Sequence, residues 1–202
     1  MSHILKMIAG AALVLLQLVA TAAWSQAQQL HFRHLSTRNG MSENNVNCIF
    51  QDSKGFAWIG TRDGLNRFDG TTFKIFRHIP KDPSSLSNNY VVHVTEDKKG
   101  NLWIATSEGG LNRYDRKRNT FQSFMEDDNN PQSISSNYIS HIQPDTDGRL
   151  WLATNSGLCL FDPIKKIALR FVHDPDNPGS LSNDMVNTVY RDSKNNIWAG
   201  TN

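Results

Sequence analysis

The chain has 202 residues, enough for a substantial core in one or two domains. Its 21 lysines and arginines nearly balance its 19 aspartates and glutamates, which argues against a nucleic-acid-binding protein and against one that binds an anionic membrane surface. Asp, Asn, Ser and Gly are plentiful after residue 27, a mixture typical of many short strands joined by tight turns.

The first segment, residues 1–27, is predicted to be a signal peptide. Lys6 precedes the apolar stretch Met7–Ala23. Ser25-Gln26-Ala27 then offers small residues at positions −3 and −1 of a cleavage site. The mature chain would begin near Gln28 and be exported. An uncleaved signal anchor is the alternative, because the apolar stretch is close to membrane-spanning length.

The next segment, residues 29–35, is predicted to be an outer strand that has no blade of its own. Phe32-Arg33-His34-Leu35 matches Phe76-Arg77-His78-Ile79 at the end of the first repeat described below. Propellers close when one terminus completes the blade that the other terminus began. We therefore expect this strand to complete a blade whose other strands lie outside the chain.

The remainder is a repeat built around tryptophan. An aspartate lies six residues before each tryptophan and a serine lies sixteen residues before it. The tryptophans are Trp58, Trp103, Trp151 and Trp198, the aspartates Asp52, Asp97, Asp145 and Asp192, and the serines Ser42, Ser87, Ser135 and Ser182. Self-similarity at this period is typical of propeller blades. The repeats run over about 42–86, 87–134, 135–181 and, in part, 182–202.

Each repeat is predicted to form four antiparallel strands. In the first copy we expect them at Val46–Gln51, Phe56–Thr61, Leu65–Phe68 and Thr72–His78, separated by turns in which Asp bonds the backbone ahead and Gly supplies a positive φ.

The second strand is apolar on both faces, so each sheet must be covered on both sides. The fold class is therefore all-β, with three complete propeller blades and a partial fourth, and the four tryptophans form the core between blades. Because a ring typically needs four to eight blades, we expect an open fragment of a larger propeller.

Two cysteines are present, Cys48 and Cys159, at non-equivalent positions of the first and third repeats. We expect two separate, mostly buried thiols without a disulfide.

The repeat resembles the two-component regulator propeller repeat. The resemblance rests on Gly40-Met41-Ser42, Trp58-Ile59-Gly60-Thr61 and Gly64-Leu65-Asn66-Arg67-Phe68-Asp69-Gly70, and on their later copies, among them Gly110-Leu111-Asn112-Arg113. Cys159-Leu160 departs from the Asn-Arg pair in the third copy. The resemblance covers Gln29–Asn202.

That family implies the periplasmic sensor region of a hybrid two-component histidine kinase, held at the periplasmic face of the inner membrane and responding to products of polysaccharide breakdown. A diguanylate cyclase is the alternative output. The implied partners are a small-molecule ligand of the oligosaccharide class, the remaining blades and kinase region of the parent protein, and a second copy in a homodimer.

The sequence carries no nucleophile–base arrangement, phosphate loop or spaced metal-ligand cluster, so we expect no catalytic activity, no cofactor, no metal and no nucleic-acid partner. A propeller-fold glycan hydrolase or lyase, or a structural interaction platform, are the alternatives. His93 and His141 occupy equivalent positions and are expected on inner strands near the central channel.

The predicted ligand site is one rim of the blades, where the loop entering the first strand meets the loop between the second and third strands. Amides, hydroxyls and tyrosine rings suit carbohydrate. The candidate residues are Arg62, Asp63, Tyr90, Ser107, Glu108, Tyr138, Asn155 and Ser156.

Overall fold

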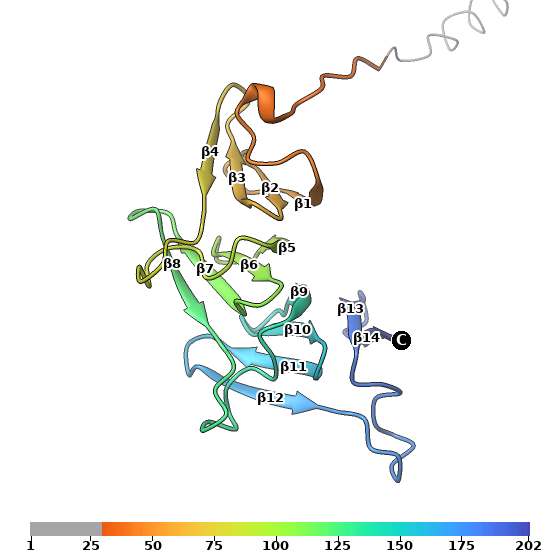
Figure 1. The fold of residues 1–202 in the computed structure, drawn as a ribbon. Coiled ribbons are helices and arrows are strands. Elements are labelled where there is room, and N and C mark those ends of the chain that lie inside the picture. Colours follow the sequence, from red (N-terminus) through yellow and green to blue (C-terminus); the bar gives the residue numbers. More distant parts are fainter. Residues whose placement is uncertain (1–29) are drawn as a thin grey trace, which may run out of the picture. The chain divides into compact units, whose positions relative to one another are not determined.

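The structure is a computed structural model that describes residues 30–202. From Leu35 onward these residues form three four-stranded antiparallel sheets and one two-stranded sheet, which we call blades 1 to 4 in chain order. The predicted fold class, an all-β series of three complete blades and a partial fourth, is confirmed. Figure 1 shows the blades following one another along the chain.

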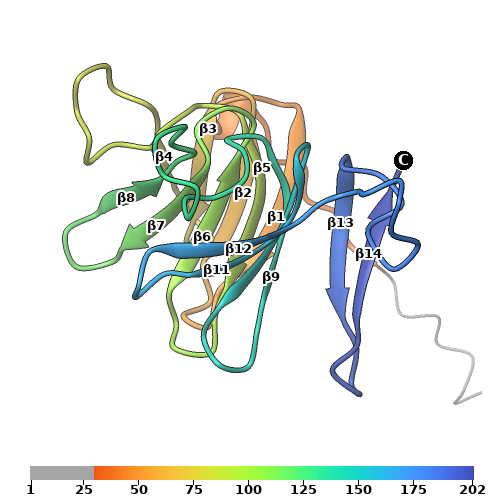
Figure 2. The ribbon, with the colours of Figure 1, turned by 90° about the horizontal axis from the view of Figure 1, so that it is seen from below.

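The strand bounds are as follows. Blade 1 holds β1 (Val46–Gln51), β2 (Ala57–Thr61), β3 (Gly64–Phe68) and β4 (Phe73–Phe76). Blade 2 holds β5 (Val91–Glu96), β6 (Leu102–Thr106), β7 (Leu111–Asp115) and β8 (Thr120–Phe124). Blade 3 holds β9 (Ile139–Pro144), β10 (Leu150–Thr154), β11 (Gly157–Asp162) and β12 (Ile167–Phe171). Blade 4 holds β13 (Val186–Arg191) and β14 (Ile197–Thr201), which follow blade 3 after a long loop in Figure 2.

The strands lie where the repeat predicts them, with small differences at the ends. The fourth strand of blade 1 is shorter than the expected Thr72–His78, because the His78 amide donates to Asn89 Oδ1 (2.7 Å) and so leaves the ladder. A one-turn 3-10 helix, η1 (Thr37–Asn39), precedes the first blade and is capped by Ser36.

The predicted signal peptide lies outside the described residues. Of the predicted outer strand at 29–35, residues 30–35 are described and carry no strand ladder. A strand needs a partner strand, so its assignment to another blade stays a prediction. Among residues 30–202 no helix is long and apolar enough to cross a membrane.

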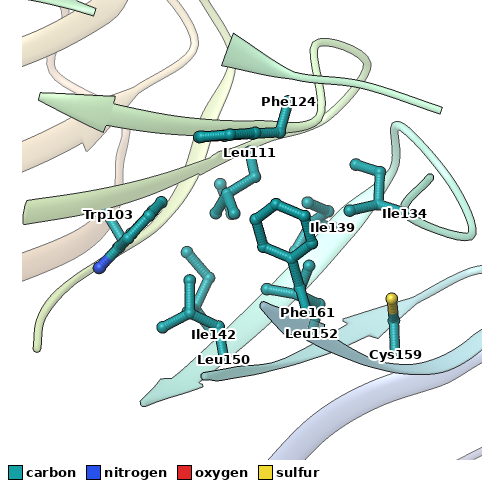
Figure 3. Close-up of a cluster of buried hydrophobic side chains, with 11 residues drawn as sticks. Trp103, Leu111, Phe124, Ile134, Ile139, Ile142, Leu150, Leu152, Cys159 and Phe161 are labelled. Atoms are coloured by element: carbon teal, nitrogen blue, oxygen red, sulfur yellow. The ribbon is translucent and has the colours of Figure 1, made fainter. Parts of the chain in front are cut away.

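Successive blades pack face to face at boundaries that we call seams 1 to 3. The face that bears the tryptophan packs on the opposite face of the next blade, so Trp58 shares a buried cluster with Val94 and Ile104. At seam 2, Trp103 and Phe124 pack against Ile142, Leu152 and Phe161, as Figure 3 shows. The innermost strands β1, β5, β9 and β13 contact one another in that order.

The tryptophans hold their blades together in a way that the sequence pattern only hinted at. Each indole Nε1 donates to the aspartate six residues earlier, at 2.7, 2.9, 3.2 and 3.0 Å in blades 1 to 4. The other oxygen of that carboxylate accepts turn amides, such as those of Lys54 and Phe56 for Asp52. The aspartate therefore ties the turn to the second strand, which explains the fixed spacing.

Not all four tryptophans are buried. Trp58 and Trp103 are fully buried and Trp151 is half-buried, whereas Trp198 is 62% exposed. Trp198 is exposed because no sheet of the described residues packs on its face, so its place in a core between blades stays a prediction.

The cysteines are free in the described residues, with Cys159 buried and Cys48 partly buried. Burial raises the pKa of each thiol to about 11.

Candidate ligand-binding rim

The rim is produced by the pairing of the first two strands of each blade. Val46 pairs with Thr61, and Val91 pairs with Thr106, so the residue before the first strand lies near the residue after the second. This geometry gathers the eight predicted residues at one end of the blades, spread over three seams.

At seam 1 two of the predicted residues meet. The Arg62 guanidinium lies over the Tyr90 ring, 5.2 Å from its centroid, a cation–π contact. Asp63 turns away from this pair and forms a bidentate ion pair with Arg77, at 3.1 and 2.8 Å. That hydrogen-bonded pair lowers the pKa of the Asp63 carboxyl.

At seam 2 the tyrosine has a different partner. The Tyr138 hydroxyl donates to Glu108 Oε1 at 3.1 Å, and this bond raises the pKa of the phenol. Ser107 stands where blade 1 has Arg62, and its amide donates to the Tyr90 carbonyl at 2.9 Å. The repeat position that carries a guanidinium in blade 1 therefore carries a small hydroxyl side chain in blade 2.

The other two predicted residues lie on the turn of blade 3. The Asn155 amide approaches the Tyr138 carbonyl at 3.4 Å, and the Ser156 hydroxyl lies 3.4 Å from Asn155 Oδ1. Both side chains are exposed.

Three of the eight predicted residues line one cavity of about 210 Å³: Ser107, Tyr138 and Asn155. The other six lining residues are Val92, Ile139, Ser140, Met185, Val186 and Asn187. Arg62, Asp63, Tyr90, Glu108 and Ser156 are not among its lining residues.

The lining residues that the sequence analysis missed share a position. Val92, Ser140 and Asn187 are each the second residue of an innermost strand, where the register with the neighbouring strand shifts by one residue. Such a bulge re-aims its side chain. The Ser140 hydroxyl bonds the Val186 carbonyl across seam 3 at 2.8 Å, and Asn47, the equivalent in blade 1, bonds the Val91 carbonyl at 2.9 Å.

His93 and His141 lie on innermost strands, as expected, with ring centroids 4.1 Å apart. His93 Nδ1 accepts from the Ile142 amide at 3.3 Å, so its ring is neutral with the proton on Nε2. Burial and the neighbouring His141 lower the pKa of His93 to about 4. Among the described residues no group of three or more His, Cys, Asp or Glu side chains could hold a metal ion.

Three larger hollows, of about 480, 420 and 250 Å³, contain none of the eight predicted rim residues. The first lies along β11 and β12 beside Asp147 and Arg149, and the second lies between Trp151 and Ile197. The rim cavity is thus the hollow that the predicted residues share.

Comparison with known proteins matches the same repeats. The model of the two component regulator propeller family matches residues 40–63, 85–108, 133–156 and 180–202. A histidine kinase of Formosa agariphila, named histidine kinase P4, is 42% identical over 74 residues, which are 37% of this chain and 5% of the kinase.

Solved structures agree with the fold. The extracellular domain assigned to a hybrid two component system of B. thetaiotaomicron matches with a TM-score of 0.75 at 27% identity, over 84% of this chain and 24% of that chain. A second extracellular domain from the same bacterium matches with a TM-score of 0.71 at 25% identity, over 87% of this chain and 23% of that one. Virginiamycin B lyase from Staphylococcus aureus, at 16% identity and a TM-score of 0.55, shares the fold.

The chain spans about a quarter of each of the two extracellular domains and a twentieth of the kinase. The matched repeats lie in all four blades. The chain belongs to the two component regulator propeller family.

Proposed function

We propose that this chain is part of the extracellular, ligand-sensing propeller of a hybrid two-component histidine kinase that responds to a glycan-derived oligosaccharide. The observation that carries the proposal is the match of all four repeats to the family, together with the likeness to extracellular domains of two-component systems. The propeller recognises the ligand and has no catalytic step of its own.

The exported location follows from the predicted signal peptide at residues 1–27, with the propeller in the periplasm and the parent protein at the inner membrane. In a sensor of this arrangement the signal is bound on one side of the membrane and phosphorylation occurs on the other, and the likeness to extracellular domains supports it.

The rim supports recognition of a sugar. It offers hydroxyl, amide and phenol groups from blades 2 and 3 beside the aromatic ring of Tyr138. Hydrogen bonds to such groups orient a sugar, and an aromatic ring packs on its C–H face. The remaining blades and the kinase region complete the parent protein, which we expect to act as a homodimer.

The proposal is tested in cells that express the full-length parent. A transcriptional reporter of its regulon should respond to oligosaccharides from one polysaccharide and lose that response when the parent gene is deleted. An unchanged response in the deletion strain would contradict the proposal. Oligosaccharide cleavage by the purified protein would instead favour a propeller-fold glycan hydrolase or lyase, and cyclic di-GMP as the product would favour the cyclase output.

A further inference from the structure

We propose that the rim cavity, which is lined by residues of blades 2, 3 and 4 and so lies across seams 2 and 3, holds a single uncharged sugar ring of that oligosaccharide, contacted by Ser107, Tyr138 and Asn155. The inference rests on the proposed sensor function and narrows it in two respects. It names one cavity of the rim, between blades 2 and 4, and it names the charge of the ligand.

The cavity is explained by one position of the repeat. The residue that follows the threonine at the end of the second strand is Arg62 in blade 1, Ser107 in blade 2 and Asn155 in blade 3. Arg62 lies over the ring of Tyr90 at seam 1. Tyr138 is the equivalent of Tyr90, and the short Ser107 side chain leaves it 46% exposed and lining the cavity.

The lining offers the groups that a neutral sugar needs. Ser107, Tyr138, Asn155 and Asn187 supply hydroxyl and amide groups at its wall, while Val92, Ile139, Met185 and Val186 supply apolar surface for the C–H groups of a ring. Asn187 Nδ2 donates to Asn202 Oδ1, which leaves Asn187 Oδ1 as an acceptor.

None of the nine described lining residues carries a charge. A charged group of the described residues does contact the lining: Glu108 accepts a hydrogen bond from the Tyr138 hydroxyl. A carboxylate at this position repels an anionic ligand, and no lysine or arginine of the lining offsets it. A neutral sugar therefore fits better than a uronic acid.

The size of the cavity limits what it holds. At about 210 Å³ it is smaller than the roughly 300 Å³ at which sites for drug-sized ligands begin. One sugar ring fits, and the rest of an oligosaccharide must extend along the open rim.

The test exchanges the two residues that distinguish seam 2 from seam 1. Isothermal titration of the full-length protein would use neutral disaccharides of glucose, galactose, mannose and xylose, with digalacturonate as the anionic probe. We expect a neutral disaccharide to bind the unmodified protein. Ser107→Arg, which places the arginine of blade 1 over Tyr138, should weaken that binding by about tenfold or more.

Arg62→Ser is the matched control at seam 1 and should leave the affinity within about twofold. Asn155→Leu keeps the side-chain volume, removes the amide and should also weaken binding. This second variant tests the same cavity if Ser107→Arg does not fold. Binding of digalacturonate alone, or neutral binding that Ser107→Arg and Asn155→Leu both leave unchanged, would overturn the inference while the sensor function stands. A parent protein that responds to no sugar in the reporter assay would overturn the sensor function itself.

Discussion

At the scale of single residues, the tryptophan of each blade does two jobs. Its indole N–H satisfies the carboxylate that opens the preceding turn, and its rings fill the seam. The second role depends on a neighbouring blade that covers the rings, whereas the hydrogen bond does not. Blades 2 and 4 therefore differ, since Trp103 is fully buried and Trp198 is 62% exposed although both make the same hydrogen bond.

Trp103→Ala is predicted to lower the free energy of unfolding by about 3–5 kcal/mol, because it leaves a cavity in seam 2 and removes the indole hydrogen bond to Asp97. Trp198→Ala is the matched control and should cost about 1 kcal/mol or less, since its side chain is already in water. Urea denaturation measures both. Equal costs for the two variants would mean that the seam packing is wrong.

His93 gives the molecule an acid-sensitive contact. Its folded-state pKa of about 4 lies below the ordinary value near 6.5, so the unfolded chain binds the extra proton first as the pH falls. The stability that the neutral ring confers is complete above pH 6.5 and is lost as the pH falls toward 4. The groups that pack on the ring are His141 and the Ile142 amide.

We therefore predict that the free energy of unfolding decreases between pH 7 and pH 5. His93→Cys introduces the residue that blade 1 has at this position, Cys48. The sulfur can still accept from the backbone amide of the next blade, and the thiol does not titrate in this range. This variant should show a smaller decrease. A pH dependence identical to that of the unmodified protein would rule out His93 as the source.

At the scale of the elements, blades 1 and 2 are joined by a charged contact beneath the seam. Arg116 donates to Asp52 at 2.7 Å and to Glu96 at 2.8 Å, while Glu96 also accepts from the Ser53 amide and hydroxyl. The Asp52 side chain is fully buried. Its pKa lies below the ordinary value because hydrogen bonds from Trp58, Arg116 and Phe56 together outweigh the cost of burial.

Arg116→Ala should lower the free energy of unfolding by about 2 kcal/mol, because it removes one partner of a buried carboxylate whose indole and amide bonds remain. Arg118→Ala is the control: its ion pair with Asp115 is largely exposed and should contribute much less than the Arg116 contacts. Thermal unfolding measures the loss of stability in both variants. A larger loss for Arg118→Ala than for Arg116→Ala would refute the stabilising role of the contact between blades 1 and 2.

The strands could be predicted from the sequence because their signals are local. Asp and Gly at fixed distances from Trp58 mark the turns, and alternation marks the buried faces. The bulges at Asn47, Val92, Ser140 and Asn187 could not be predicted, since a bulge of this kind needs no special residue. The location of the rim could be predicted from the strand order. The cavity within it could not, because it depends on how Ser107 of blade 2 and Tyr138 of blade 3 are placed relative to each other.

The hydrogen bonds of the Asn in the Gly-Leu-Asn-Arg motif also could not be predicted from the sequence, because they join residues far apart in the chain. Asn66 accepts from the Ser42 amide at 2.8 Å and donates to its hydroxyl at 2.8 Å, and Asn112 does the same for Ser87. The motif therefore ties the third strand to the entry of the first. Blade 3 has Cys159 at this position, where burial accounts for the residue type without a ligand role.

At the scale of the whole molecule, the series of blades leaves two apolar faces uncovered in the described residues. Ile49 in blade 1 is 70% exposed, and Tyr190 and Trp198 in blade 4 are 60% and 62% exposed. At every seam a tryptophan-bearing face packs on the opposite face of the next blade. The two uncovered faces are of these complementary kinds, so we expect copies of residues 28–202 taken alone to associate through a heterologous contact.

Residues 28–202 alone should therefore self-associate in a concentration-dependent way, as size-exclusion chromatography with light scattering would measure. Ile49→Asp should shift the population toward the monomer. Ile164→Asp, on an exposed turn away from either face, should leave it unchanged. A monodisperse monomer of the unmodified chain at high concentration would show that these faces do not bind each other.

The central claim is that a sugar bound at the propeller rim controls a kinase. Autophosphorylation of the full-length parent in membrane vesicles, with and without the disaccharide that binds it, tests that claim most directly. We predict that the sugar changes the rate of autophosphorylation and that Ser107→Arg raises the sugar concentration needed for this change by about tenfold or more. A rate that no sugar alters in the unmodified protein would contradict the account.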